Sequence, residues 1–160
     1  MFDLKKESYL KFILIFSFIA LISAYFIEYI LGHQPCNLCL IERIPYGLSI
    51  ILIISIFILK KYERFFILLL ILTFIFSFVI SFYHYGIEQG FFEESAICGL
   101  KDISENITKE DLLKQLNKKI VSCKDVTFRF FGLSLTSINI VISLFFIITL
   151  VKINTKIKNL

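Results

Sequence analysis

Two cysteines separated by two residues, Cys36 and Cys39, are the side chains of this chain best suited to chemistry. Two further cysteines, Cys98 and Cys123, lie far from this pair and from each other in the sequence. Close-spaced thiols are typical of redox motifs, in which a thiolate attacks a disulfide and electrons pass by exchange. They also make structural disulfides and zinc sites. The cysteines therefore indicate redox exchange, with structural stapling or zinc binding as alternatives.

Loop-closure entropy distinguishes the two pairs. A disulfide between Cys36 and Cys39 would contribute roughly 2 kcal/mol, against roughly 3.5 kcal/mol for one between Cys98 and Cys123. A Cys36–Cys39 disulfide would add little constraint, because insertion of the adjacent helix into the membrane already restricts this segment. This pair therefore favours a redox role. The second would constrain a long loop, so both roles stay open for it. Structural zinc usually takes two close-spaced pairs, and because Cys98 and Cys123 are far apart we predict no metal.

Four long apolar runs dominate the rest of the chain, which is 58% hydrophobic with a mean hydropathy of +0.83. Each run is close to the ~20 residues that cross a ~30 Å hydrocarbon core as a helix. Runs without apolar–polar alternation favour helices over a barrel. The sequence predicts an all-α integral membrane protein, a single domain over residues 1–160 built as a bundle of four transmembrane helices. These helices are expected at residues 10–31, 41–59, 65–85 and 130–151.

Basic residues near the ends of the runs predict the orientation. Lysine and arginine gather before the first run, between the second and third, and after the fourth. The loop at 32–40 is followed by a single base, Arg43, and the loop at 86–129 balances its bases with acids. Both termini are therefore expected in the cytoplasm, and both cysteine-bearing loops outside a bacterial inner membrane, where disulfides persist. The net charge of +4 then reflects topology rather than nucleic-acid binding.

Polar residues at the outer ends of the helices suggest a site for an electron acceptor. Cys39 is expected near a helix N-terminus, where partial positive charge favours the thiolate. Arg43 follows one helical turn later, so its guanidinium could stabilise a thiolate or an anionic acceptor, or else simply lie at the membrane surface. His84 ends the third run at the same depth. Arg43 and His84 could line a pocket open to lipid, where the obvious acceptor is a quinone.

A short amphipathic helix is predicted within the second outer loop. Thr108 and Asp111 form a capping-box pattern, and apolar residues recur at helical spacing after them as far as Ile120. With Lys118 and Lys119 alongside, the pattern favours a helix lying on the membrane, and a solvated face is the alternative.

Several short motifs follow one another along the chain, and they contain most of the residues discussed above. They are Pro35-Cys36-Asn37-Leu38-Cys39 with Glu42-Arg43 and Pro45-Tyr46, then Tyr83-His84-Tyr85-Gly86 with Glu88-Gln89, then Cys98, and finally Cys123 with Phe131-Gly132-Leu133-Ser134 and Asn139. With these motifs and its four spans, the chain closely resembles the DsbB family, the bacterial disulfide bond formation protein B, over nearly its full length. The segments before Cys36 and Cys98 look most like the alphaproteobacterial branch.

The resemblance implies that the chain reoxidises a soluble periplasmic thiol oxidase of the DsbA type. In the family's scheme, reduced DsbA attacks a disulfide between Cys98 and Cys123, and Cys98 forms the mixed disulfide. Electrons then pass to the Cys36–Cys39 pair. The cysteine that matches Cys39 reduces a bound quinone, either ubiquinone or menaquinone.

Three further positions match residues near the quinone in that family. Arg43 matches the arginine that supports the quinone, Glu42 a neighbouring acid or amide, and His84 a histidine near the ring. Two positions depart from the family pattern. Leu135 lies in a segment that often has Met, and Phe128 in one that often has Trp. These departures concern the quinone pocket more than the thiol chemistry.

Overall fold

The structure is a computed structural model of the 160-residue chain, and it describes residues 2–93, 98, 122–124, 129–130 and 133–158. Its helices are α1 (Phe2–Tyr29), α2 (Asn37–Ile41), α3 (Ile44–Ile58), α4 (Glu63–Glu88) and α6 (Leu135–Lys158), with a 3-10 turn η1 (Lys60–Tyr62). Strands β1 (Arg129–Phe130) and β2 (Leu133–Ser134) form an antiparallel pair in which Arg129 lies opposite Ser134. The predicted amphipathic helix at 108–120 falls outside the described residues.

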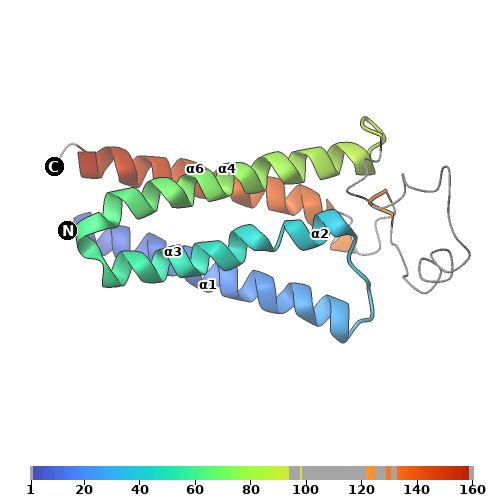
Figure 1. The fold of residues 1–160 in the computed structure, drawn as a ribbon, viewed down its shortest axis with the longest axis horizontal. Helices are drawn as coiled ribbons and strands as arrows, with labels where there is room; N and C mark the ends of the chain where they lie inside the picture. Colours follow the sequence, from blue (N-terminus) through green and yellow to red (C-terminus); the bar gives the residue numbers. More distant parts are fainter. Residues whose placement is uncertain (1, 94–97, 99–121, 125–128, 131–132, 159–160) are drawn as a thin grey trace, which may run out of the picture.

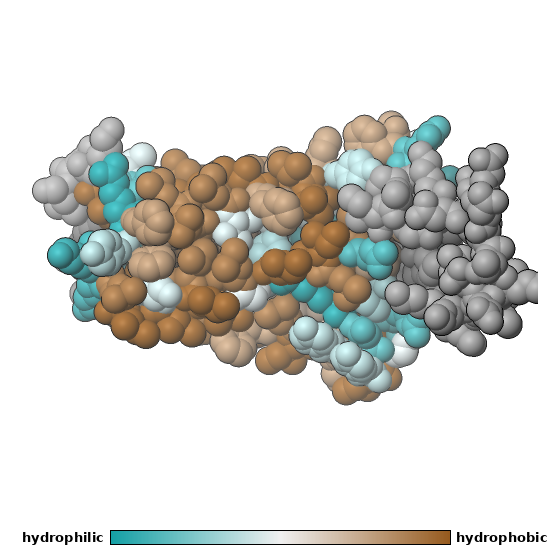
Figure 2. Space-filling model, in the orientation of Figure 1, coloured by the Kyte–Doolittle hydropathy of each residue, from teal (hydrophilic) through white to brown (hydrophobic). Residues whose placement is uncertain are grey.

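The helices form an elongated bundle in which α4 and α6, α3 and α4, and α1 and α3 pack against each other (Figure 1). Four segments of the described chain are long and apolar enough to cross a membrane: Lys6–Tyr29, Asn37–Ile58, Lys60–Glu88 and Leu135–Ile157. Apolar side chains cover the middle of the face shown in Figure 2, and hydrophilic ones gather toward its ends. This confirms the predicted all-α membrane bundle with four helices.

Two details of the bundle differ from the prediction, and each has a local cause. The second span is divided into α2 and α3, with Pro45 in the first turn of α3, where its missing N–H costs no hydrogen bond. The fourth helix begins at Leu135 rather than at residue 130. Ser134 explains this start, because its Oγ accepts a hydrogen bond from the backbone N–H of Ser137 at 3.2 Å, as an N-cap residue does.

The core of the bundle is apolar along most of its length, and aromatic rings mark its centre. Phe74 of α4 and Phe146 of α6 are fully buried, and their rings meet edge to face with centroids 5.0 Å apart. Tyr46 of α3 packs against Phe74 in the same way. Lipid tails are as apolar as these side chains, so close packing rather than escape from water holds such helices together.

Buried hydroxyl groups join the helices at several levels. Ser49 of α3 donates to Ser17 of α1 at 2.8 Å, and Ser143 of α6 donates to Ser77 of α4 at 3.1 Å. Small polar residues allow close approach of helices in lipid and satisfy one another across the interface. These contacts fix how each helix is rotated, and therefore which residues face the site at the end of the bundle.

That site lies at the end of the bundle opposite the chain termini. The first turn of α1 and the last turn of α6 lie at one end, and α2 lies at the other (Figure 1). All four cysteines belong to the α2 end, because Cys36 precedes α2 and packs in one cluster with Cys98 and Cys123.

Candidate functional site

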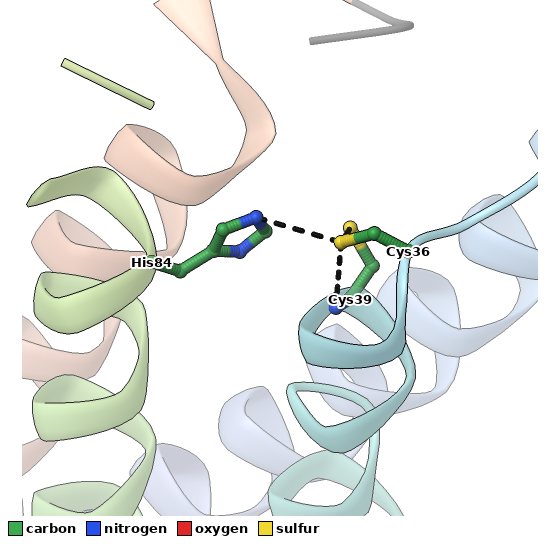
Figure 3. Close-up of side chains that lie close together, drawn as sticks. All are labelled: Cys36, Cys39 and His84. Atoms are coloured by element: carbon green, nitrogen blue, oxygen red, sulfur yellow. Dashed lines mark hydrogen bonds between the residues drawn. The ribbon is translucent and has the colours of Figure 1, made fainter. Parts of the chain in front are cut away.

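Cys36 and Cys39 form a close, unbonded thiol pair at the start of α2. Cys36 is the N-cap residue of this helix, and its Sγ accepts a hydrogen bond from the backbone N–H of Cys39 at 3.3 Å. The two Sγ atoms are 2.8 Å apart and share a hydrogen bond (Figure 3). The helix start thus presents the sulfur of Cys36 to a backbone N–H. The sequence predicted the favoured thiolate at Cys39, but the chain enters α2 at Cys36, so Cys36 takes the N-cap position and Cys39 lies within the helix.

The surroundings of Cys36 favour its thiolate. The hydrogen bond from the Cys39 side chain is the largest influence, and with the nearby His84 ring it lowers the pKa of Cys36 from 9.0 to about 4, against the opposing effect of burial. Cys36 is only 5% exposed, so little water reaches its sulfur to replace these hydrogen bonds. A thiolate here could act as a nucleophile or as a metal ligand.

His84 approaches the thiol pair from α4. Its Nε2 lies 3.5 Å from Cys36 Sγ, and its Nδ1 lies 2.8 Å from Glu42 Oε1. The ring is buried, with 2% of its surface exposed. A carboxylate beside Nδ1 holds the proton there and fixes the ring, so Nε2 is directed at the sulfur of Cys36.

Glu42 links this histidine to a second group of polar residues inside the bundle. Its Oε2 accepts a hydrogen bond from Asn139 Nδ2 at 3.0 Å. The Oδ1 of Asn139 in turn accepts a hydrogen bond from Tyr46 Oη at 2.5 Å, and its Nδ2 also donates to Ser81 Oγ at 2.7 Å. His84 of α4 and Asn139 of α6 therefore hold the two oxygens of Glu42, and Tyr46 of α3 holds Asn139. Asn139 and Tyr46 were not predicted as site residues, although both belong to the motifs quoted for the family resemblance.

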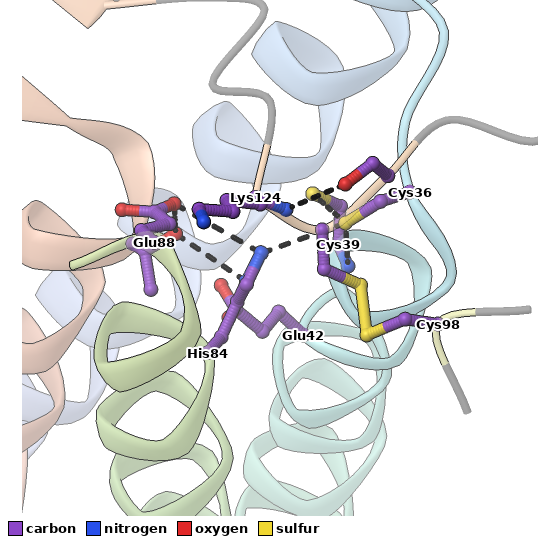
Figure 4. Close-up of a disulfide and its surroundings, with 10 residues drawn as sticks. Cys36, Cys39, Glu42, His84, Glu88, Cys98 and Lys124 are labelled. Carbon is purple, nitrogen blue, oxygen red and sulfur yellow. Dashed lines mark hydrogen bonds and ion pairs between the residues drawn. A yellow bond between two sulfur atoms is a disulfide. The ribbon is translucent and has the colours of Figure 1, made fainter. Parts of the chain in front are cut away.

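The second cysteine pair is a disulfide that packs against the first pair. Cys98 and Cys123 are bonded, with Cα atoms 5.8 Å apart, and both are buried. They share one apolar cluster with Cys36, and Cys39 packs at its edge. Figure 4 shows Cys98 beside Cys36 and Cys39. Two cysteine pairs far apart in the sequence therefore meet, one oxidised and one reduced.

A cavity of about 410 Å³ opens beside the thiol pair, between α1, α2–α3 and α6. Cys39, Glu42 and Arg43 contribute to its lining, whereas Cys36 and His84 do not. Its walls are mainly apolar and include Leu135, the position that departs from the family pattern. Cys39 thus lies between Cys36 and the cavity.

Arg43 is fixed at the cavity by two residues of α1. Its guanidinium forms an ion pair with the carboxylate of Glu28 and lies over the ring of Tyr25, 5.1 Å from the ring centre. Its side chain is 15% exposed, so the charge is largely shielded from solvent. Glu28 was not predicted as a site residue, because an acid near the end of a span commonly lies at the membrane surface.

The residues of the cavity fit a quinone. Membrane quinones need an apolar slot with a few polar groups at the ring, and this cavity offers the Arg43 guanidinium, the Glu42 carboxylate and the Cys39 thiol among aliphatic walls. A metal ion would find different ligands. The Sγ atoms of Cys36 and Cys39 and a ring nitrogen of His84 all lie within 4.8 Å of one another.

The fold and the site define a membrane protein with two adjacent cysteine pairs at one end of a four-helix bundle. The family model for the disulfide bond formation protein DsbB matches residues 6–153, and the chain therefore belongs to the DsbB family. It is also 31% identical over 152 residues to an uncharacterised protein of Rickettsia prowazekii (strain Madrid E), covering 92% of this chain and 88% of that relative. Membership in this family makes the protein an oxidoreductase of disulfide bond formation.

Proposed function

We propose that this protein is a thiol:quinone oxidoreductase that reoxidises a periplasmic thiol oxidase of the DsbA type. One observation carries the proposal: Cys39 touches both the Cys36 thiol and the apolar cavity, while the Cys98–Cys123 disulfide packs in one buried cluster with Cys36 and does not line that cavity. This order supports a path in which electrons enter at Cys98–Cys123, pass to Cys36–Cys39 and leave into the cavity.

The first step is thiol–disulfide exchange with the partner. A thiolate of the reduced oxidase attacks the Cys98–Cys123 bond, and by the family resemblance Cys98 takes the mixed disulfide. The second thiolate of the partner then displaces Cys98. The partner leaves with a disulfide, and Cys98 and Cys123 hold two electrons and two protons as thiols.

The second step passes the disulfide between the two pairs of this chain. The Cys36–Cys39 disulfide is attacked by a thiolate of the outer pair, and a further exchange closes Cys98–Cys123 again. The outcome is a bonded outer pair and a reduced inner pair, which is the arrangement in the structure. The shared packing of the pairs supports exchange between them with little movement.

The last step returns the inner pair to its disulfide. A ubiquinone or menaquinone in the cavity would supply an acceptor for two electrons and two protons. Cys36 and Cys39 lose those electrons and protons as their sulfur–sulfur bond forms. Arg43, held by Glu28 and Tyr25, places a fixed positive charge where the acceptor gains negative charge.

The same proposal gives the protein a location. Both termini would face the cytoplasm of a bacterial inner membrane, and the cysteine end of the bundle would face the periplasm. The termini lie at the end of the bundle opposite α2, which supports this arrangement, as do the basic residues near the termini (Figure 1).

The test uses the purified full-length protein in detergent with a reduced DsbA-type oxidase and a short-chain ubiquinone. We expect quinone absorbance to fall as partner thiols disappear, one quinone for each pair of thiols. Cys39→Ser should abolish quinone reduction, and Cys98→Ser should abolish oxidation of the partner. Ser55→Ala removes a hydroxyl that makes an exposed hydrogen bond to the Ile51 carbonyl of its own helix, and it serves as the control. Partner oxidation that persists at the same rate in Cys39→Ser protein with quinone as the only oxidant would refute the proposal.

A further inference from the structure

We propose that reduced Cys36, Cys39 and His84 form a binding site for a zinc ion, which holds the inner pair in its reduced form. From the sequence, a zinc site would have needed all four cysteines as ligands. The structure removes Cys98 and Cys123 from that set, because they are bonded to each other, and supplies His84 instead. Two thiols and an imidazole make a ligand set that zinc binds in proteins.

The ligand atoms converge from two helices. The sulfurs of Cys36 and Cys39 and a nitrogen of His84 lie within 4.8 Å of one another, and Nε2 is 3.5 Å from Cys36 Sγ. Zinc binds sulfur at about 2.3 Å and nitrogen at about 2.0–2.1 Å in a tetrahedron, so the two sulfurs must separate to nearly 4 Å. Cys39 has room for this rotation because its side chain borders the cavity.

Glu42 contacts His84 in the way that a carboxylate typically contacts a metal-binding histidine. A ligating imidazole almost always donates its other N–H to a carboxylate or carbonyl, which fixes its tautomer and orientation. Glu42 Oε1 lies 2.8 Å from His84 Nδ1, and Asn139 holds the other carboxylate oxygen. With one proton of His84 held on Nδ1 by Glu42, Nε2 faces the Cys36 sulfur and binds the metal after releasing any proton that it shares with that sulfur.

Glu88 is the carboxylate near His84 that could complete the tetrahedron, although it lies outside the group of three ligands that meet within 4.8 Å. It follows His84 by one turn of α4, and its Oε1 lies 3.9 Å from His84 Nε2. Its side chain is 6% exposed, with Oε1 accepting a hydrogen bond from Thr136 at 2.6 Å. Oε2 is buried and has no hydrogen-bond partner within the described part of the chain.

Binding would change no oxidation state. The protons that the two sulfurs and His84 Nε2 share are released as the metal–ligand bonds form, and chelation of the metal returns them. Sulfurs held by zinc cannot join as a disulfide, so zinc would arrest turnover with the inner pair reduced. This arrest depends on the proposed function, whereas the binding itself does not.

The binding test uses the full-length double variant Cys98→Ser/Cys123→Ser, in which only the inner pair remains. After reduction and removal of the reductant, the protein is titrated with Co²⁺ as a spectroscopic probe and then with Zn²⁺. We expect one ion per chain, sulfur-to-cobalt charge-transfer absorption, and displacement of cobalt by zinc. After the inner pair has been oxidised, we expect no binding.

Further substitutions in that background identify the ligands. Cys36→Ser and His84→Ala should weaken binding at least 100-fold, and Glu42→Gln by about 10- to 100-fold. Ser55→Ala, which removes a hydroxyl with an exposed hydrogen bond inside its own helix, should bind with unchanged affinity and unfold at the same temperature as its parent. Equal binding after Cys36→Ser, binding by the oxidised pair, or no cobalt–sulfur band with folded protein would overturn the site.

The arrest is tested separately on the wild-type protein. Quinone reduction with the reduced partner is measured with and without Zn²⁺, and then after a chelator is added. We expect a loss of at least tenfold that the chelator reverses. Active protein that binds zinc in the first test yet turns over at full rate with the site occupied would overturn the arrest alone.

Discussion

Glu42 and His84 form a buried pair in which Oε1 of the carboxylate lies 2.8 Å from Nδ1 of the ring. His84 contacts the Cys36 sulfur and does not line the cavity, whereas Glu42 lines the cavity and does not contact that sulfur within the described hydrogen bonds. The pair therefore links the Cys36 sulfur to the site proposed for the quinone, alongside the direct contact that Cys39 makes with both.

Glu42→Gln should slow reoxidation of the inner pair about tenfold, because a neutral amide no longer holds a proton on His84 Nδ1 and no longer fixes the ring as firmly. The measurement is the rate of quinone reduction by the pre-reduced protein as a function of pH. A positioning role predicts that the pH profile shifts together with the rate. A uniform loss at every pH, with an unchanged profile, would mean that Glu42 acts only in packing.

Arg43→Met should lower kcat/KM for the quinone about tenfold or more, because it removes the positive charge beside the cavity. Oxidation of the partner by Cys98–Cys123 in a single turnover should proceed as in the wild type, since that step does not use the cavity. Lys11→Met is the matched control. It removes a charge from the same helix as Glu28, at a side chain that is 61% exposed.

Glu28→Gln separates loss of the cation from loss of its ion pair. The substitution leaves Arg43 over the Tyr25 ring, so quinone reduction should stay within a factor of about five of the wild type. If Glu28→Gln were as damaging as Arg43→Met, the ion pair rather than the charge on Arg43 would be the important feature. Steady-state kinetics over a range of quinone concentrations distinguish the two outcomes.

The spans were predictable because length and hydropathy alone decide which segments cross a bilayer. The Glu28–Arg43 and Glu42–Asn139 contacts were not, because they depend on how each helix is rotated about its axis. That rotation is fixed by pairs such as Ser17–Ser49, which join residues distant in the sequence. His84 was predicted as a site residue from its position near the membrane surface and from its motif. The sequence did not predict that its ring contacts Cys36 and does not line the cavity.

Gly86→Ala should destabilise the protein, although alanine favours helices, because of the ring that packs on this glycine. A Cβ at Gly86 would lie 2.1 Å from Cδ2 of Phe92, whose ring stacks on Tyr83. Displacing the ring should cost about 1–3 kcal/mol, less the gain of up to about 1 kcal/mol in helix propensity. Gly47→Ala is the control, since nothing lies within 4 Å of its added Cβ.

Thermal unfolding in one detergent checks this pair of variants. Gly47→Ala should unfold at or slightly above the wild-type temperature, and Gly86→Ala below it. Equal shifts for both would show that the Phe92 ring moves aside freely. The ring would then contribute nothing to the turn in which Phe91 and Phe92 donate backbone hydrogen bonds to the Gly86 carbonyl.

The reactivity of Cys36 should depend on its hydrogen bond with Cys39. In the folded protein the pKa of Cys36 is lowered from 9.0 to about 4, chiefly by the Cys39 side chain, so the thiolate dominates at neutral pH. Alkylation of Cys36 should therefore be nearly independent of pH above the midpoint and fall as the pH drops through it. Two substitutions of Cys39 test this dependence.

Cys39→Ala removes the donor and should move the midpoint of Cys36 alkylation upward by about one pH unit or more. Cys39→Ser retains a hydroxyl donor and should move this midpoint less. In both variants Cys36 is the one thiol outside the Cys98–Cys123 disulfide, so mass spectrometry of the alkylated protein reports it directly. Midpoints that coincide in the two variants would show that the backbone and His84, rather than the neighbouring thiol, set the reactivity of Cys36.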